Sequence, residues 1–190
     1  MGNDHVGLDA FAGHLLPGES VEWWGQPQQG LLLTRHDGML IPFSLLWGGF
    51  SIFWEVKALQ SEQPLPFGLF GIPFVFIGLY LIAGRFAVDA WLRARMFYAL
   101  TDRRVLIVRR APWPNFQALS LGRLPETTLN EGSHGRGTIR FGTPALVPDG
   151  EGGRQYASSW TAALDPTPQF LAIDDARNVF AAIQQRAQGV

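Results

Sequence analysis

The side chains best able to bind a ligand are seven arginines between Arg85 and Arg110. Only two acidic residues lie among them, so this segment has a local net charge of +5 in a chain whose net charge is −1. Guanidinium groups pair with phosphate oxygens, and basic clusters beside a membrane attract anionic lipid. The arginines expected nearest to a membrane face, and therefore the candidates for contact with anionic lipid, are Arg85, Arg93, Arg95, Arg103 and Arg104.

A second interpretation of these arginines is topological. Basic residues beside an apolar segment hold the adjoining domain in the cytoplasm and touch lipid headgroups without recognising any lipid in particular. We favour this interpretation over specific lipid recognition. Nucleic-acid binding is favoured less than either, because the arginines adjoin apolar segments and the nearby aromatic residues fit a core.

Other patterns that could support chemistry are weak. The glycine-rich stretch from Gly132 to Gly142 lacks the Gly-Lys-Ser/Thr of a nucleotide loop and precedes a strand-like segment, so it predicts a hairpin loop. Glu19 and Glu22 have no evident partner for acid–base catalysis. The chain has no cysteine, and its histidines are dispersed without metal-ligand spacing: His5, His14, His36 and His134. The sequence therefore predicts no catalytic residue, no cofactor and no metal site.

The elements that would position the arginines include two apolar segments. Residues 38–54 are uncharged, which as a helix would extend about 26 Å, and residues 63–84 are uncharged over about 33 Å. A hydrocarbon core is about 30 Å thick. We therefore predict transmembrane helices over residues 38–56 and 67–95, the second with a cytoplasmic extension, joined by a short extracytoplasmic loop over residues 57–66. The alternative is a pair of core helices buried by the rest of the chain.

The first predicted span has two distinct faces. Ser44, Gly48 and Ser51 form a stripe of small residues, which allows close packing on Gly71 and Gly78 of the second span. The other stripe is aromatic, and we expect it to point outward and to dock a partner helix or a second copy: Phe43, Trp47, Phe50 and Trp54. Pro73 is expected to kink the second span.

The distribution of basic residues predicts the orientation. The connecting loop carries Lys57 alone, whereas Arg35 precedes the first span and five arginines closely follow the second. The positive-inside rule then places both termini in the cytoplasm of a multi-pass protein of the inner membrane. Residues 1–37 are expected to form a cytoplasmic segment with a short helix and a strand.

The period of the sequence changes after the second span. Short strand patterns separated by turn residues begin at Met96, and an amphipathic helix with Asp174 as its N-cap closes the chain. The segment 143–168 is long and rich in glycine and proline, so it is either a flexible loop or carries an extra strand near Arg154. Residues 96–190 thus predict an antiparallel β-barrel or sandwich capped by a C-terminal α-helix.

Three stretches resemble bacterial PH-domain-containing membrane proteins of unknown function. They are "YALTDRRVLIV", "GTIRFG" and "FLAIDDARNVFAAIQ", and "PGESVEWWGQP" with "IPFSLLWGGFSIFWE" resembles the members that carry a two-helix hairpin. The resemblance extends from about Leu16 onward. It implies a membrane α+β protein with a transmembrane helical hairpin followed by a PH-like fold, and it implies no activity.

The expected function is a membrane-anchored PH-like interaction or scaffold module, an accessory subunit of a membrane complex without catalysis. Its expected partners are membrane lipid and a protein, or a second copy bound through the spans, with no nucleic acid and no small-molecule substrate. One alternative is an adaptor that responds to anionic lipid through the arginines. Another is a component of an enzyme or transporter, which is less favoured because residues 38–54 and 63–84 carry no charge that could line a transport pathway.

Overall fold

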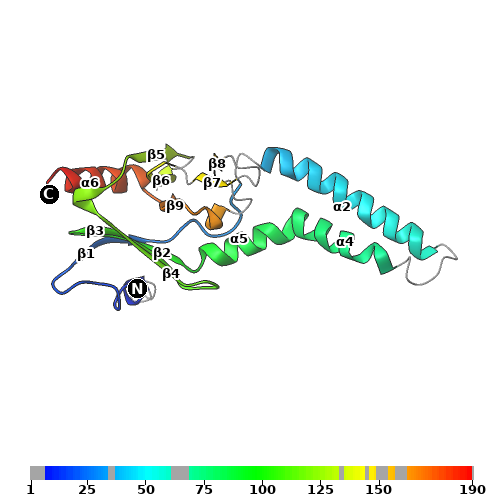
Figure 1. Cartoon of the computed structure of the whole chain (residues 1–190), viewed down its shortest axis with the longest axis horizontal. Helices are drawn as coiled ribbons and strands as arrows, with labels where there is room; N and C mark the ends of the chain where they lie inside the picture. The colour runs from blue at the N-terminus through cyan, green and yellow to red at the C-terminus, as the bar shows by residue number, and fades with distance from the viewer. Residues whose placement is uncertain are drawn as a thin grey trace. The chain divides into compact units, whose positions relative to one another are not determined.

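The computed structural model describes residues 7–33, 37–60, 69–132, 135–143, 146–148, 154–156 and 162–189. The chain is an α+β protein made of two compact units. Met1–Gly30 and Trp91–Val190 form the first, here called the β-domain, and Leu31–Ala90 form the second, the helical hairpin (Figure 1). The predicted boundaries at residues 37 and 96 differ from this division, because the N-terminal segment supplies a strand to the domain that follows the second apolar helix.

That strand, β1 (Val21–Gly25), belongs to a four-stranded antiparallel sheet. Its neighbours in order are β2 (Met96–Thr101), β3 (Arg104–Arg109) and β4 (Asn115–Ser120). Gly25 pairs with Tyr98 and Val21 with Thr101, so the strand before the hairpin lies beside the strand after it. The polar turn between β2 and β3 is held by the Thr101 hydroxyl, which accepts hydrogen bonds from the backbone N–H groups of Arg103 and Arg104.

A three-stranded antiparallel sheet follows, with β6 (Gly137–Phe141) between β5 (Thr127–Glu131) and β9 (Gln169–Ile173). Within the long segment 143–168, β7 (Leu146–Pro148) pairs with β8 (Arg154–Tyr156). The extra strand expected near Arg154 is therefore present, and it has a partner strand that the sequence pattern did not indicate.

The core of the β-domain explains why β2 has no polar face. All six residues of β2 are buried, because both faces of the strand are covered. On one face the Tyr98 ring stacks on Phe170 of β9 at a centroid distance of 4.8 Å, and Phe141 meets Phe170 edge-on at 5.3 Å. On the other face, Phe97 packs with Phe11 of the N-terminal segment.

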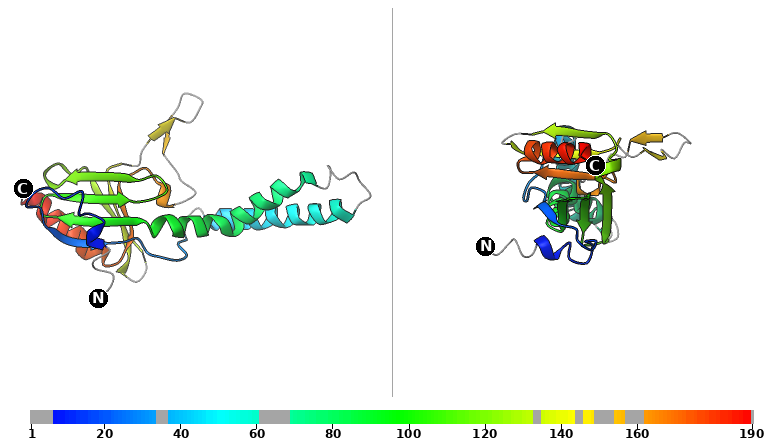
Figure 2. Two further views of the ribbon diagram at one scale, coloured as in Figure 1. Left: turned by 90° about the horizontal axis from the view of Figure 1, so that it is seen from below. Right: turned by 90° about the vertical axis from the view of Figure 1, so that its left-hand side faces the viewer.

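The chain ends in α6 (Ala176–Gln188), which packs on β5 and β6 (Figure 2). Its buried face includes Val179 and Ile183. The predicted N-cap, Asp174, is wrong by one residue: Asp175 precedes the helix in a left-handed conformation with φ of 51°, and its side chain makes no capping hydrogen bond. Asp174 instead pairs with Arg136 at 3.0 Å.

The helical hairpin consists of α2 (Asp37–Gln60) and a second, segmented helix. The second helix contains α4 (Ile72–Leu79), a π-helical turn η1 (Tyr80–Gly84) and α5 (Arg85–Arg93). Helix α2 runs four residues beyond the predicted end at Val56, and the rest of the predicted loop, from residue 61, lies outside the described residues. Pro73 stands in the first turn of α4, where its missing N–H has no helical partner to lose.

Candidate functional site in the helical hairpin

The two helices expose most of their apolar surface. Asp37–Gln60 and Ile72–Arg93 are each long and apolar enough to cross a membrane, and only 22% and 17% of their most apolar windows are buried. Leu46, Phe50 and Phe76 are among the large side chains left more than 60% exposed. This exposure argues against the alternative in which the rest of the chain buries both helices as a core.

The helices touch each other through small residues. Ser44, Gly48 and Ser51 are buried on the face of α2 that packs on the second helix. A Cβ atom added to Gly78 would lie 2.8 Å from the Cα of Gly48, so the two backbones are in direct contact there. The Ser44 and Ser51 hydroxyls donate to carbonyls of their own helix, at Ile41 and Trp47, which satisfies both groups in an apolar setting.

The buried face of α2 that carries Ser44, Gly48 and Ser51 is called the seam here. The aromatic stripe lies beside the seam and not on the opposite side of α2. Each aromatic residue of the stripe stands one position before a residue of the seam: Phe43 before Ser44, Trp47 before Gly48, Phe50 before Ser51 and Trp54 before Glu55. Consecutive residues lie about 100° apart around a helix. Trp47 therefore reaches Phe74 of α4 at a centroid distance of 6.3 Å, whereas Phe43 and Phe50 are 52% and 61% exposed. The expectation that all four aromatic residues point outward thus fails for Trp47, whereas Phe50 and Trp54 are exposed and also line the groove between the helices.

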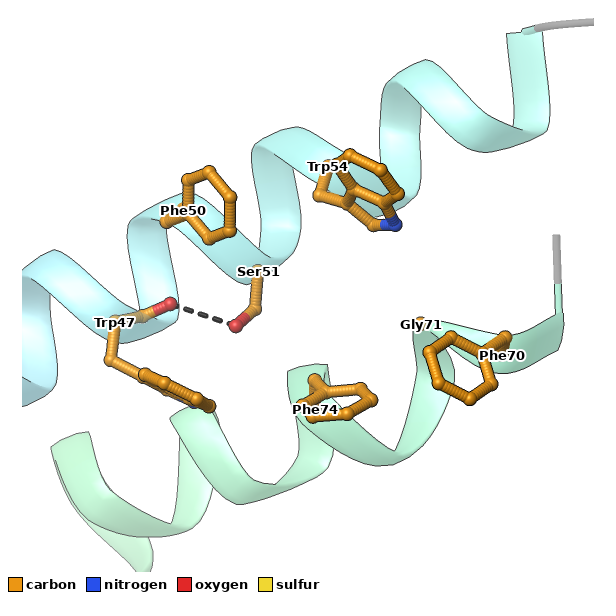
Figure 3. A pocket seen from close by; sticks show the side chains of 7 residues that line it. All are labelled: Trp47, Phe50, Ser51, Trp54, Phe70, Gly71 and Phe74. Carbon is orange, nitrogen blue, oxygen red and sulfur yellow. Dashed lines mark hydrogen bonds between the residues drawn. The ribbon is translucent and has the colours of Figure 1, made fainter. Parts of the chain in front are cut away.

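This groove contains a pocket of about 260 Å³, which we call the aromatic pocket (Figure 3). Trp47, Phe50 and Trp54 line it from α2, Phe70 and Phe74 line it from the second helix, and Ser51 and Gly71 complete it. Five aromatic rings around one small space create an apolar surface whose ring faces are electron-rich.

Glu55 lies at the end of the same seam. It is buried, with 8% of its surface exposed, and within the described part of the chain neither carboxylate oxygen has a hydrogen-bond partner. Its Oε2 atom packs on Gly71, where an added Cβ atom would collide with this oxygen and would lie 3.5 Å from Cδ1 of Trp54. The structure therefore encloses the Glu55 carboxylate between the two helices, against Gly71, without a hydrogen-bond partner among the described residues.

The opposite end of α2 carries a buried ion pair. Nη1 of Arg85 lies 2.6 Å from Asp37, with both side chains about 5% exposed, and Nε of Arg85 donates to the Leu81 carbonyl. The guanidinium also stacks over the Phe86 ring at 4.3 Å. Arg85 thus ties the two helices together, and its burial contradicts the expectation that it contacts lipid headgroups.

Two of the other candidate arginines, Arg93 and Arg104, also form hydrogen bonds within the protein. Arg93 is fully buried and donates to the backbone carbonyls of Gln28 and Gly30, which contradicts its predicted lipid contact. Arg104 binds Glu19. Arg95 is half-buried and stacks on Trp91 at 3.9 Å, and Arg103 is 55% exposed. Of the five predicted lipid contacts, Arg103 and part of Arg95 remain accessible.

The pair of Glu19 and Arg104 clasps the N-terminal segment to the sheet. Nε of Arg104 donates to Oε1 of Glu19 at 2.8 Å and Nη2 to Oε2 at 2.7 Å, while the N–H of Leu16 and the hydroxyl of Thr101 supply two more donors. These donors, Arg104 first among them, lower the pKa of Glu19 to about 2 despite its burial. The same contact raises the pKa of Arg104. This arrangement is structural, since every oxygen of the carboxylate is occupied by protein.

No protein-family model matches the chain, and neither a curated protein sequence nor a solved structure does. The features of the molecule itself therefore define its class: an α+β protein whose β-domain is interrupted by an apolar helical hairpin. Sequence reasoning overlooked Glu55 as part of the hairpin seam. Its spacing contained the information, because residues 44, 48, 51 and 55 recur at intervals of four, three and four.

Proposed function

We propose that the chain is a membrane-anchored, non-catalytic interaction module. The observation that carries this proposal is the unburied apolar surface of the helical hairpin, whose two helices match the thickness of a hydrocarbon core. In water such a surface would be a large aggregation liability, whereas in lipid it is the favoured exterior.

The pairing of β1 with β2 supports a hairpin topology. These strands flank the hairpin in sequence and are hydrogen-bonded neighbours, so both ends of the hairpin lie on the same side of any membrane that it crosses. Both helices therefore cross or neither does. The arginines on the β-domain side support, under the positive-inside rule, a cytoplasmic location for that side and thus the inner membrane of a bacterium.

The β-domain supports the PH-like part of the proposal. A four-stranded and a three-stranded antiparallel sheet packed through Phe170, with one C-terminal helix, match the outline that the sequence resemblance implies. A domain of this kind would present a surface to a cytoplasmic protein. A response to anionic lipid is the weaker alternative, since Arg95 and Arg103 are the accessible members of the predicted set.

We further propose that the outward part of the aromatic stripe docks another transmembrane helix, from a second copy or from a partner subunit. Phe43 and Phe50 carry this role because they are exposed and stand seven residues apart on one side of α2, although Phe50 also borders the aromatic pocket. Replacing both with leucine keeps the segment apolar. The expected result is a loss of crosslinked species in the membrane at an unchanged protein level, measured with a crosslinker active in lipid.

Phe76→Leu is the matched control, because Phe76 is 68% exposed on the other helix and lies off the stripe. This variant should crosslink as the wild type does. Unchanged crosslinking of the Phe43/Phe50 variant would show that the stripe only faces lipid and that any partner is held by the β-domain.

A further inference from the structure

The turn between β3 and β4 carries exposed basic and aromatic side chains at one end of the four-stranded sheet. We call residues 110–114 the β3–β4 tip. Trp113 is 65% exposed there, more than any other tryptophan that the structure describes. Arg110 is also exposed, and its guanidinium lies over the Phe97 ring at 5.0 Å. Tryptophan and arginine both favour the headgroup region of a bilayer, because each joins an apolar body to a polar group.

The β3–β4 tip adjoins the segment that leaves the second apolar helix. The N–H of Arg110 donates to the carbonyl of Arg95 at 3.0 Å, and the candidate membrane span ends at Arg93, two residues before Arg95. The Arg95 guanidinium stacks on Trp91 at 3.9 Å, and Trp91 is 44% exposed. A pair of tryptophan and arginine at the end of the helix therefore lies next to a second such pair at the end of the sheet.

Arg109 fixes the shape of the tip. This half-buried residue pairs with Asn115 in the sheet, and its Nε donates across the turn to the carbonyl of Trp113 at 3.1 Å. The hydrogen bond ties the exposed tryptophan to a regular strand. Arg109 is therefore a positioning residue, and Trp113 stands at a defined place beyond the end of β3.

The positive charge of this surface is not neutralised by the protein. Among the residues that the structure describes, neither Arg95 nor Arg110 forms an ion pair with a carboxylate. Elsewhere in the β-domain, Arg140 pairs with Asp165 and Arg104 with Glu19. Two guanidinium groups without counter-charges, flanked by exposed tryptophans, complement a surface that presents phosphate groups.

We propose that the β3–β4 tip, together with Trp91 and Arg95, docks the β-domain on the anionic surface of the membrane that the hairpin crosses. Trp113 lies in the headgroup layer, and Arg95 and Arg110 pair with phospholipid phosphates. This inference rests on the proposed function, since it requires a membrane-spanning hairpin. It adds a lipid class and a docking surface in which Arg110 and Trp113 were not among the lipid contacts expected from the sequence.

The other accessible arginine of the expected set lies at the opposite end of the sheet. Arg103 precedes Arg104, which pairs with Ser120 at the end of β3 remote from Arg109. Six residues of strand separate these two ends by about 17 Å. Docking through the tip therefore predicts no lipid contact at Arg103 or Ser120, and the two ends of the sheet serve as each other's control.

The chain contains no cysteine, so one fluorescent label can be attached at a chosen position. Pro114→Cys places the label beside Trp113, and Ser120→Cys places it at the exposed far end of the same strand. The full chain is studied in nanodiscs of phosphatidylglycerol that contain a lipid with a nitroxide quencher on its headgroup. Pro114→Cys should lose fluorescence and Ser120→Cys should keep it. Equal quenching at the two positions, or none at either, would overturn the proposal.

Lipid charge and salt test the electrostatic part. The loss of fluorescence in Pro114→Cys should be smaller in nanodiscs of phosphatidylcholine, which have no net charge. It should also be smaller at 1 M salt, where the Debye length falls to about 3 Å. Quenching that is as strong in phosphatidylcholine as in phosphatidylglycerol would show that the tip has no preference for anionic lipid, and the proposal would fail.

Variants in the Pro114→Cys background identify the groups that make the contact. Arg110→Gln and Trp113→Ser should each reduce the quenching, and both positions are exposed, so the fold should be kept. Arg123→Gln is the matched control, because Arg123 is an exposed arginine just beyond the far end of β4. If Arg110→Gln is quenched as strongly as the chain with Arg110, the guanidinium takes no part in docking and the proposal fails.

A further label separates this inference from the proposed function. Leu46 is 75% exposed on α2, so Leu46→Cys reports insertion of the hairpin through a lipid with a nitroxide in its acyl chain. Quenching at position 46 without quenching at position 114 would overturn the docking, keep the membrane anchor and leave the tip free for a protein. Absence of quenching at position 46 would instead refute the membrane anchor itself.

Discussion

Replacing Glu19 with glutamine tests the clasp between the N-terminal segment and the sheet. Glutamine has nearly the same shape as glutamate but cannot form the two charged hydrogen bonds with Arg104. The substitution also leaves the Arg104 guanidinium, which is 17% exposed, without its counter-charge. We therefore expect the β-domain to lose stability.

The size of the effect follows from the pKa of Glu19. A carboxyl group whose pKa falls from 4.5 to about 2 on folding stabilises the folded state by about 3 kcal/mol at neutral pH. This stabilisation is complete above pH 4.5, the unfolded value, and disappears as pH falls toward 2, the folded value. The difference between wild type and Glu19→Gln should therefore be about 3 kcal/mol at pH 7 and should shrink steadily as the pH falls from 4.5 to 2.

Urea unfolding of the full chain in a non-ionic detergent measures this difference. Tryptophan fluorescence is a suitable signal, because Trp23 and Trp24 lie in β1 beside the clasp. Glu131→Gln serves as the control: Glu131 also makes two hydrogen bonds to an arginine, Arg177, but the pair is on the surface and should matter little. Equal stability of wild type and Glu19→Gln at pH 7, or a difference that does not change with pH, would refute the reasoning.

Three further predictions concern the hairpin, the closing helix and the topology. Gly78→Val should separate the helices, because the Cβ atom of the valine would lie 2.8 Å from the Gly48 backbone, and should lower the protein level in membranes, measured by immunoblotting. Gly49→Ala should behave as the wild type, because nothing lies within 4 Å of a Cβ atom added there. Ile183→Asp should unfold the β-domain and abolish its thermal transition in circular dichroism, since Ile183 is fully buried and an unpaired buried charge costs several kcal/mol; an unchanged transition would show that α6 is dispensable. A reporter active only outside the cytoplasm should be silent after residue 190 and active after Gln60, and the reverse pattern would contradict the orientation.

The β-domain was largely predictable because its strands carry local signals. Runs such as Met96–Thr101 and Arg104–Arg109 are bounded by polar turn residues, and the closing helix has a regular apolar face. The pairing of β1 with β2 was not predictable in this way. It joins segments on either side of the hairpin, and no local pattern in the sequence specifies a partner so distant along the chain.

The candidate site was predicted only in part. The small-residue stripe indicated which face of α2 packs on the second helix, but the outward orientation expected for the aromatic stripe does not hold for Trp47, which reaches Phe74. The roles of Arg85 and Arg93 were also misjudged, because a sequence shows the charge of an arginine and not whether an acidic side chain or free carbonyl groups lie within its reach. Asp37, Gln28 and Gly30 supply those partners in the structure.

The interruption of the β-domain by the hairpin has a consequence for biosynthesis. The ribosome makes β1 before either span and β2 after both, so the four-stranded sheet stays incomplete until the whole hairpin has been synthesised. Under the proposed membrane topology, a nascent chain that inserted only one of the two helices would leave β1 and β2 on opposite sides of the membrane. The edge of β2 would then stay unpaired and Phe97 uncovered, which is the kind of defect that quality-control proteases degrade. Under that topology, completion of one sheet would report that both helices have been inserted.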